Sequence, residues 1–174
     1  MYIVIGLGNP TEEYARTRHN TGRMVADFIE RKEIGGIKIH HLDTFMNLSG
    51  KGVAKIVKSK KAAEKLIVIH DDIDMPLGKM KIVFARGSGG HRGVLSVMKA
   101  IKTENFIRIK IGVLPTTPGG KLKKPKGERE VERFILGEFK KPEAEVLKKV
   151  FKKSAQAVEV IASEGVARAM NLFN

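Results

Sequence analysis

The first twenty residues constrain the fold of this chain most strongly. An apolar run at residues 2–5 breaks abruptly at Gly6-Leu7-Gly8-Asn9-Pro10, and a polar stretch follows before helical spacing begins. A short apolar run that ends in glycine and proline is typical of a strand covered on both faces. The polar stretch after it carries Tyr14 and His19. Side chains that can act in catalysis or ligand binding therefore follow directly after a buried strand.

The same pattern recurs three times further along the chain. Apolar runs end in polar islands at residues 44–50, 70–74 and 87–93. In open α/β sheets, ligands bind outside the carboxyl ends of the strands. We therefore expect the four islands, which are rich in His, Asn and Asp, to meet in one site.

Hydrophobic periodicity predicts alternating strands and helices. Short apolar or alternating runs predict strands at 2–5, 66–70 and 107–113, with weaker candidates at 37–41 and 79–84. Helical spacing predicts helices that begin near Asn20, around 53–57 and 94–101, over 142–163 and after Gly165. This alternation and the length of 174 residues indicate an α/β layered fold in a single domain, 1–174.

Two segments have distinctive patterns of their own. In the strand at 107–113, isoleucines alternate with Arg108 and Lys110, which predicts a half-exposed strand with one basic face. Residues 115–130 are rich in proline, glycine and basic residues. We expect this segment to be a mobile loop rather than a linker between domains.

The charge of the chain favours an anionic partner. There are 33 Lys and Arg against 19 Asp and Glu, which gives a net charge of +14. Such an excess is typical of proteins that bind nucleic acid. The alternative is a lysine-rich surface adapted to heat, but ion-pair networks would need more acids to match the bases.

Composition also excludes several kinds of chemistry. The chain has no cysteine, so disulfides, thiolate zinc sites and a cysteine nucleophile are excluded. No apolar run approaches the roughly twenty residues of a membrane span, and no secretory signal is apparent. We expect a cytoplasmic protein without membrane contact.

The candidate catalytic residues are histidines and carboxylates. His19 precedes a helix, whose N-terminal field disfavours imidazolium and so helps to keep a general base neutral. The segment His70-Asp71-Asp72-Ile73-Asp74 allows two interpretations. Its carboxylates could bind a metal ion, or one of them could orient a histidine and stabilise its protonated form. We favour orientation, because adjacent residues of a strand point in opposite directions.

Glycine-rich and polar segments complete the set of candidates. The amides of residues 87–91, ahead of a helix, could hold a phosphate. Gly6-Leu7-Gly8 lacks the third glycine of a dinucleotide-binding loop, so we reject that function. Asn47 is as well placed to cap a helix as to bind a ligand. Met46 and Phe45 are residue types more often found in a core than in a ligand contact.

Five motifs occur together and in a fixed order. They are Gly6-Leu7-Gly8-Asn9-Pro10, the segment from Tyr14 to Gly22 with Thr17-Arg18-His19-Asn20, Thr44-Phe45-Met46-Asn47-Leu48-Ser49-Gly50, His70-Asp71-Asp72 followed by Asp74, Pro76 and Gly78, and Gly87-Ser88 followed by Gly90-His91 and Gly93. In this order, and over nearly the whole chain, they closely resemble bacterial-type peptidyl-tRNA hydrolase. The resemblance implies hydrolysis of the ester that joins a peptide to the terminal ribose of tRNA. It also implies a monomer with a mixed, mostly parallel sheet in three layers, and neither metal nor cofactor.

The resemblance assigns a role to each residue of this chain that matches a functional position of the family. His19 resembles the general base, Asp71 the carboxylate that orients it, and Asn9 the amide that distinguishes a blocked peptidyl nitrogen from a free amine. The resemblance assigns substrate and tRNA contacts to Tyr14, Phe45, Met46, Asn47, His91, Arg92 and Lys110.

The chain departs from the family pattern at three places. Arg92 stands where asparagine is usual, and Lys110 stands where arginine is common and acts as a point charge rather than a fork. The segment 33–43 is short, which indicates a missing strand or hairpin.

Two other functions remain open from the sequence. One is a metal-dependent hydrolase that uses His70, Asp71, Asp72 and Asp74. The other is an RNA-binding module without catalysis, for which Lys110 and the basic segment 121–129 would supply the phosphate contacts.

Overall fold

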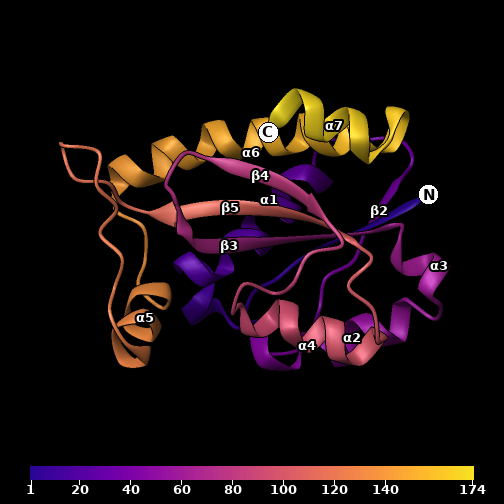
Figure 1. The fold of residues 1–174 in the computed structure, drawn as a ribbon, viewed down its shortest axis with the longest axis horizontal. Helices are drawn as coiled ribbons and strands as arrows, with labels where there is room; N and C mark the ends of the chain where they lie inside the picture. Colours follow the sequence, from indigo (N-terminus) through magenta and orange to yellow (C-terminus); the bar gives the residue numbers. More distant parts are fainter.

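The computed structural model describes residues 1–174 as a five-stranded sheet with helices on both faces (Figure 1). The strand order is β2-β1-β3-β5-β4. The strands are β1 (Tyr2–Gly6), β2 (Ile37–Ile39), β3 (Leu66–Pro76), β4 (Met80–Phe84) and β5 (Ile107–Leu114). All pairings are parallel except that of β4 with β5. The expected mixed, mostly parallel sheet is confirmed.

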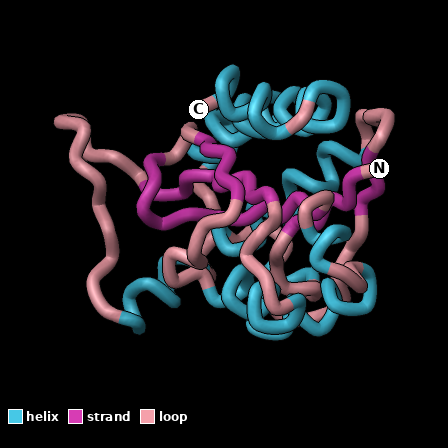
Figure 2. The backbone as a smooth tube through the Cα atoms, turned by 45° about the vertical axis from the view of Figure 1, so that its right-hand side comes forward, coloured by secondary structure: helices cyan, strands magenta, loops and turns pink.

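Helices form the two outer layers (Figure 2). The helices of the chain are α1 (Thr21–Glu30), α2 (Ser49–Ile56), α3 (Lys60–Ala63), α4 (Arg92–Ile101), α5 (Glu128–Ile135), α6 (Lys141–Glu164) and α7 (Val166–Phe173), with 3₁₀ turns at Glu12–Tyr14, Arg18–Asn20 and Met46–Leu48; α5 lies beyond the end of the sheet, outside the two layers (Figure 1). The predicted helices near 20, 53–57, 94–101 and 142–163 and after Gly165 are confirmed. None of the helices combines the length and the apolar character that a membrane crossing requires.

The sheet separates two apolar cores because side chains alternate across each strand. On β3, Ile67 and Ile69 pack with α1, α6 and α7, whereas Leu66 and Val68 pack with α2 and α4. A strand that is apolar on both faces is the expected sequence for this central position. Packing in these two cores fixes the positions of the strands that carry the polar residues.

Gly22 allows α1 to lie against the sheet without an intervening side chain. A Cβ atom at this position would lie 2.1 Å from the carbonyl oxygen of Ile69. The backbone amide of Arg23 donates to the carbonyl of Leu7 across the same contact, at 3.1 Å. This close approach brings the 3₁₀ turn at Arg18–Asn20 against β3, where the polar part of that strand begins.

Three predictions about the fold are wrong in detail. β3 does not end at His70, because Asp71 and Asp72 continue its pairing with Ile111 and Gly112 of β5. β5 is not half-exposed, since it lies between β3 and β4 and Arg108 is buried. Residues 115–130 are not entirely loop, because α5 begins at Glu128.

Candidate active site

A cavity of about 470 Å³ opens at the end of the sheet where β1 and β3 meet the turns at Arg18–Asn20 and Met46–Leu48. Residues from all four polar islands line it, so the expectation that these islands meet is confirmed. Among the predicted site residues, the lining includes Asn9, Tyr14, His19, Met46, Asn47, Asp71, His91, Arg92 and Lys110. Phe45 does not line the cavity, but its ring packs edge-to-face against that of Tyr14, with 6.3 Å between the ring centroids.

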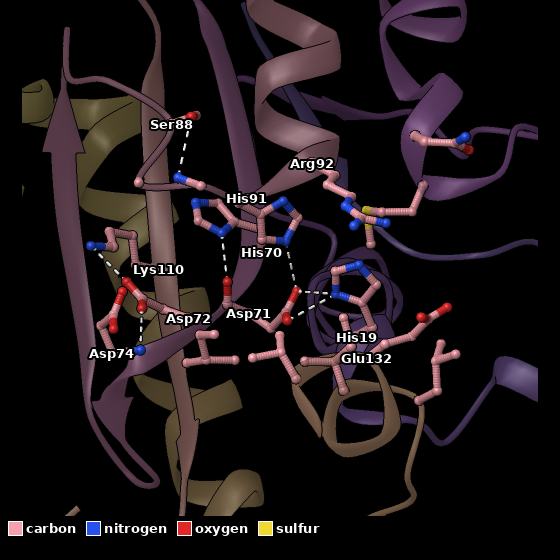
Figure 3. Close-up of a pocket in the computed structure, with 18 of the residues that line it drawn as sticks. His19, His70, Asp71, Asp72, Asp74, Ser88, His91, Arg92, Lys110 and Glu132 are labelled. Atoms are coloured by element: carbon pink, nitrogen blue, oxygen red, sulfur yellow. Dashed lines mark hydrogen bonds and ion pairs between the residues drawn. The ribbon is translucent and has the colours of Figure 1, made fainter. Parts of the chain in front are cut away.

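Asp71 binds two histidines at the bottom of this cavity (Figure 3). Its carboxylate oxygens lie 2.9 and 3.0 Å from Nδ1 of His19. One of them also lies 2.8 Å from Nε2 of His91. All three side chains are at least nine-tenths buried. We call His19, Asp71 and His91 the floor cluster.

The hydrogen bonds fix which ring nitrogens carry protons. His19 donates its Nδ1–H to Asp71, so the lone pair of its Nε2 is available as a base. His91 donates from Nε2 to Asp71, while its Nδ1 accepts the backbone N–H of Val94 at 3.3 Å. Both nitrogens of His91 are therefore occupied. In the floor cluster, only His19 offers a free ring nitrogen.

Asp71 is held in its ionised form. Burial alone would raise the pKa of Asp71, but the attraction and hydrogen bonds of His19 and His91 outweigh burial and hold that pKa well below its ordinary value. A permanent negative charge beside Nδ1 stabilises the imidazolium that forms when Nε2 takes up a proton. The pair can thus work as a general base with its orienting carboxylate.

Asn9 presents one side of its amide to the cavity. Its Oδ1 accepts the backbone N–H of Met46 at 2.9 Å. Asn20 braces its backbone by accepting the N–H of Asn9 and donating to its carbonyl, both at 2.9 Å. The amide NH₂ of Asn9 is left without a partner in the protein and faces a cavity that it lines. This geometry gives the site a fixed hydrogen-bond donor.

His70 and Arg108 support the site from below. Nδ1 of His70 donates to the carbonyl of Asp71 at 2.7 Å, and Arg108 donates to the carbonyls of Arg86 and Gly87. Burial is the main cause that lowers the pKa of His70 well below its ordinary value, with further contributions from His91 and Arg108 against an opposing one from Asp71. The alternating pattern of β5 concealed this role of Arg108, which it predicted to be exposed.

α5 forms a wall of the cavity that the sequence did not predict. Val131, Glu132, Ile135 and Leu136 of this segment line it. Arg18, which directly precedes His19, contacts the C-terminal end of α5. Its guanidinium lies 4.5 Å from the centre of the Phe134 ring and donates a hydrogen bond of 3.3 Å to the Phe134 carbonyl. Arg18 also pairs with Glu143 of α6. The position of the wall is thereby tied to that of His19.

Ion pairs join the outer elements of the cavity. Arg92 pairs with Glu128 at the start of α5, and Lys124 pairs with Asp74. We call these two exposed contacts the rim pairs. The Asp74 carboxylate raises the pKa of Lys124 by hydrogen bonding and attraction. Lys110 lies deeper and binds Asp72 at 2.6 Å.

The four residues of the metal hypothesis do not converge on one point. Asp72 and Asp74 bind lysines, and His70 binds backbone. The groups with ligand atoms within 4.8 Å of one another are instead His19, Asp71 and His91. These three could hold a metal ion only by giving up the hydrogen bonds described above. This geometry does not support the alternative of a metal site at His70, Asp71, Asp72 and Asp74.

A histidine oriented by a carboxylate, with a free ring nitrogen beside a polar cavity, is a geometry that can activate water for hydrolysis. The family model described as peptidyl-tRNA hydrolase matches residues 3–42 and 34–174. The chain belongs to the peptidyl-tRNA hydrolase family and is a hydrolase. The two matched parts meet at the short segment 33–43.

Relatives and solved structures agree over the full length. The chain is 39% identical to the peptidyl-tRNA hydrolase of Thermodesulfovibrio yellowstonii, with 100% of this chain and 99% of the relative covered. It is 36% identical to that of Syntrophotalea carbinolica, with 100% and 97% covered. The crystal structure of peptidyl-tRNA hydrolase from Acinetobacter baumannii matches with a TM-score of 0.86 and 26% identity, covering 100% of this chain and 94% of that one.

Proposed function

We propose that the chain hydrolyses peptidyl-tRNA by general-base activation of water, with His19 as the base and Asp71 as its orienting carboxylate. The observation that carries this proposal is the hydrogen bond from Nδ1 of His19 to the buried, ionised Asp71. It leaves Nε2 toward the cavity, free to take a proton from water as the water attacks the ester carbonyl. A positioned base of this kind contributes about 10²–10⁴-fold to a rate.

In this proposal Asn9 discriminates peptidyl-tRNA from aminoacyl-tRNA. Its amide orientation is set by the Met46 N–H, so it offers only donor hydrogens to the cavity. The carbonyl oxygen of a peptide or acyl group can accept such a hydrogen. A free α-ammonium carries donors only, and would meet a donor without an acceptor.

The remaining predicted contacts divide by chemistry. Tyr14, Met46 and Asn47 line the cavity together with Asn9, Phe45 packs against Tyr14, and these four residues would hold the peptide. Arg92 and Lys110 would bind the acceptor end, where they meet phosphate without reading bases, and His91, whose ring nitrogens are both occupied, would contact that end through its ring. The chain would act as a monomer. We place this action in the cytoplasm, where the substrate is made.

Single-turnover hydrolysis of N-acetylated aminoacyl-tRNA by wild type and His19→Ala tests the proposal. Unacetylated aminoacyl-tRNA serves as the control, and EDTA is present throughout. We expect cleavage of the blocked substrate only, with a rate that falls at least 10²-fold in the variant. Equal rates for the two proteins would remove His19 from its role. Salt-sensitive tRNA binding without cleavage by either protein would support an RNA-binding module instead.

A further inference from the structure

One acid on the cavity lining differs from the others. Glu132 of α5 lines the cavity but has no cation and no hydrogen-bond donor within contact distance (Figure 3). The other acids there all have basic partners: Asp71 with His19 and His91, Asp72 with Lys110, Asp74 with Lys124, and Glu128 with Arg92. A carboxylate that faces a substrate cavity without a protein partner is available to pair with a ligand.

The surroundings of Glu132 suit a particular kind of ligand. Val131, Ile135 and Leu136 place apolar surface on the same wall of the cavity. α5 has no buried residue, so its apolar side chains remain partly open to the cavity. Lysine and arginine combine an apolar stem with a cationic end, and so bury the stem while the charge meets a polar group. An apolar wall beside a carboxylate is complementary to such a side chain.

The distribution of charge separates this wall from the RNA. The basic lining residues are Arg92 of α4, Arg108 and Lys110 of β5, and Lys124, which precedes α5 and is paired with Asp74, whereas Glu132 lies within α5. A carboxylate repels phosphate, and like charges across an interface suppress the wrong orientation of a partner. The RNA is therefore directed toward the basic elements, which leaves the peptide to face α5.

We propose that Glu132 is a specificity-determining residue that binds a positive charge on the peptide part of the substrate. The substrates it favours are peptidyl-tRNAs with a lysine or arginine side chain, or a free terminal ammonium, next to the esterified residue. This inference rests on the proposed function. It adds to that function a preference among peptides, which neutral amides such as Asn9 cannot supply.

The test compares two acetylated dipeptidyl-tRNAs on one tRNA, acetyl-lysyl-alanyl and acetyl-norleucyl-alanyl. Norleucine keeps an apolar chain and lacks the ammonium group. We expect wild type to prefer the lysyl substrate about threefold in kcat/KM, as an exposed ion pair allows. Glu132→Gln should reduce this ratio to about one, and Glu132→Lys should invert it.

Glu130→Gln is the matched control. Glu130 lies on the same helix and does not line the cavity, so this variant should keep the wild-type ratio. A second pair, alanyl-alanyl-tRNA with and without acetylation, tests a terminal ammonium in place of a side chain. A preference for the charged member of either pair that Glu132→Gln abolishes supports the inference.

Three results would overturn the inference about Glu132 and leave the proposed function intact. The first is equal hydrolysis by wild type within both pairs. The second is a preference that persists in Glu132→Gln, and the third is a preference that Glu130→Gln removes equally, which would indicate a general effect of net charge. A wild-type protein that hydrolyses none of the four substrates overturns the proposed function, and this inference with it. Hydrolysis with equal ratios overturns this inference alone.

Discussion

The floor cluster and the rim pairs hold their charges in different ways. Asp71 is about 2% exposed and binds both floor histidines at once, within 3.0 Å. The partners in the rim pairs are between 54% and 78% exposed, and each carboxylate meets a single cation. Buried hydrogen bonds to a charged group resist competition from water, whereas exposed ion pairs contribute little and are screened by salt. The floor is built to keep one geometry, and the rim is built to exchange partners.

The difference suits a reaction whose reactive bond is constant and whose substrates vary. The ester and the attacking water are the same in every peptidyl-tRNA, so a rigid base can serve all of them. Peptides and tRNAs differ, and phosphate can replace Glu128 on Arg92 at little cost. Four experiments can break or sharpen this comparison.

The largest effect is expected from Asp71→Asn. The amide removes the charge that stabilises protonated His19 and can turn an N–H toward Nδ1, which favours the wrong tautomer. We expect kcat to fall by about 10²–10⁴-fold while the affinity for tRNA stays within about twofold. Single-turnover kinetics and filter binding measure the two quantities. A loss of tRNA affinity equal to the loss of rate would show that the floor and the rim are not separate.

Arg18→Ala should give the largest loss of stability. The variant leaves Glu143 unpaired at 13% side-chain exposure and releases the end of α5 from Phe134. We expect urea denaturation to give a free energy of unfolding about 2–3 kcal/mol lower than that of wild type. Arg16→Ala is the matched control, because the Arg16–Glu138 pair is exposed and 3.7 Å long. Equal losses in the two variants would contradict the anchoring of α5 by Arg18.

His70→Gln should change how stability depends on pH. The pKa of folded His70 lies below its ordinary value of 6.5, so below pH 6.5 the unfolded chain binds a proton that the folded chain does not. The contribution of neutral His70 is therefore complete above pH 6.5 and is lost as the pH falls below it. Wild type should lose about 1 kcal/mol more stability than the variant between pH 7.5 and pH 5.5. Parallel urea curves for the two proteins would refute this.

The rim variants should have the smallest effects, and in opposite directions. Arg92→Ala removes a phosphate contact, so kcat/KM should fall by about threefold at most. Glu128→Gln frees Arg92 for phosphate, so kcat/KM should rise slightly at low salt and return to the wild-type value at high salt. Measurements at two salt concentrations distinguish these cases. A change beyond tenfold in either variant would place the rim among the catalytic elements.

Local pattern was sufficient to predict much of the fold. The apolar run at residues 2–5 and the stripe over 142–163 became β1 and α6, because burial there follows directly from periodicity. α5 was missed because its sequence, Glu-Arg-Glu-Val-Glu-Arg-Phe-Ile, buries no residue and follows a segment rich in proline and glycine. The extension of β3 was missed because acidic residues are poor strand formers, and only the pairing with β5 holds them there.

The sequence predicts which residues form the site better than it predicts the hydrogen bonds between them. Motifs indicated that His19, Asp71 and His91 belong together, although 52 and 20 residues separate the two histidines from Asp71. The tautomer of His91 depends on the N–H of Val94, and the orientation of Asn9 depends on the N–H of Met46. No spacing in the sequence encodes these contacts. Glu132 could be found only once α5 was seen to form a wall.

The occupied nitrogens of His91 determine how charge moves during the proposed reaction. When His19 acts as a neutral base, the floor cluster holds one net negative charge, on Asp71, because Nδ1 of His91 accepts the N–H of Val94 and carries no proton. When His19 takes the proton of water, the cluster becomes neutral overall and the substrate oxygen becomes the anion. Negative charge thus passes outward from the buried interior to the open cavity, toward Arg92 and Lys110. Protonated His19 is the second charge buried in this step, and the Asp71 carboxylate beside it compensates that charge, while the total charge within the site is conserved.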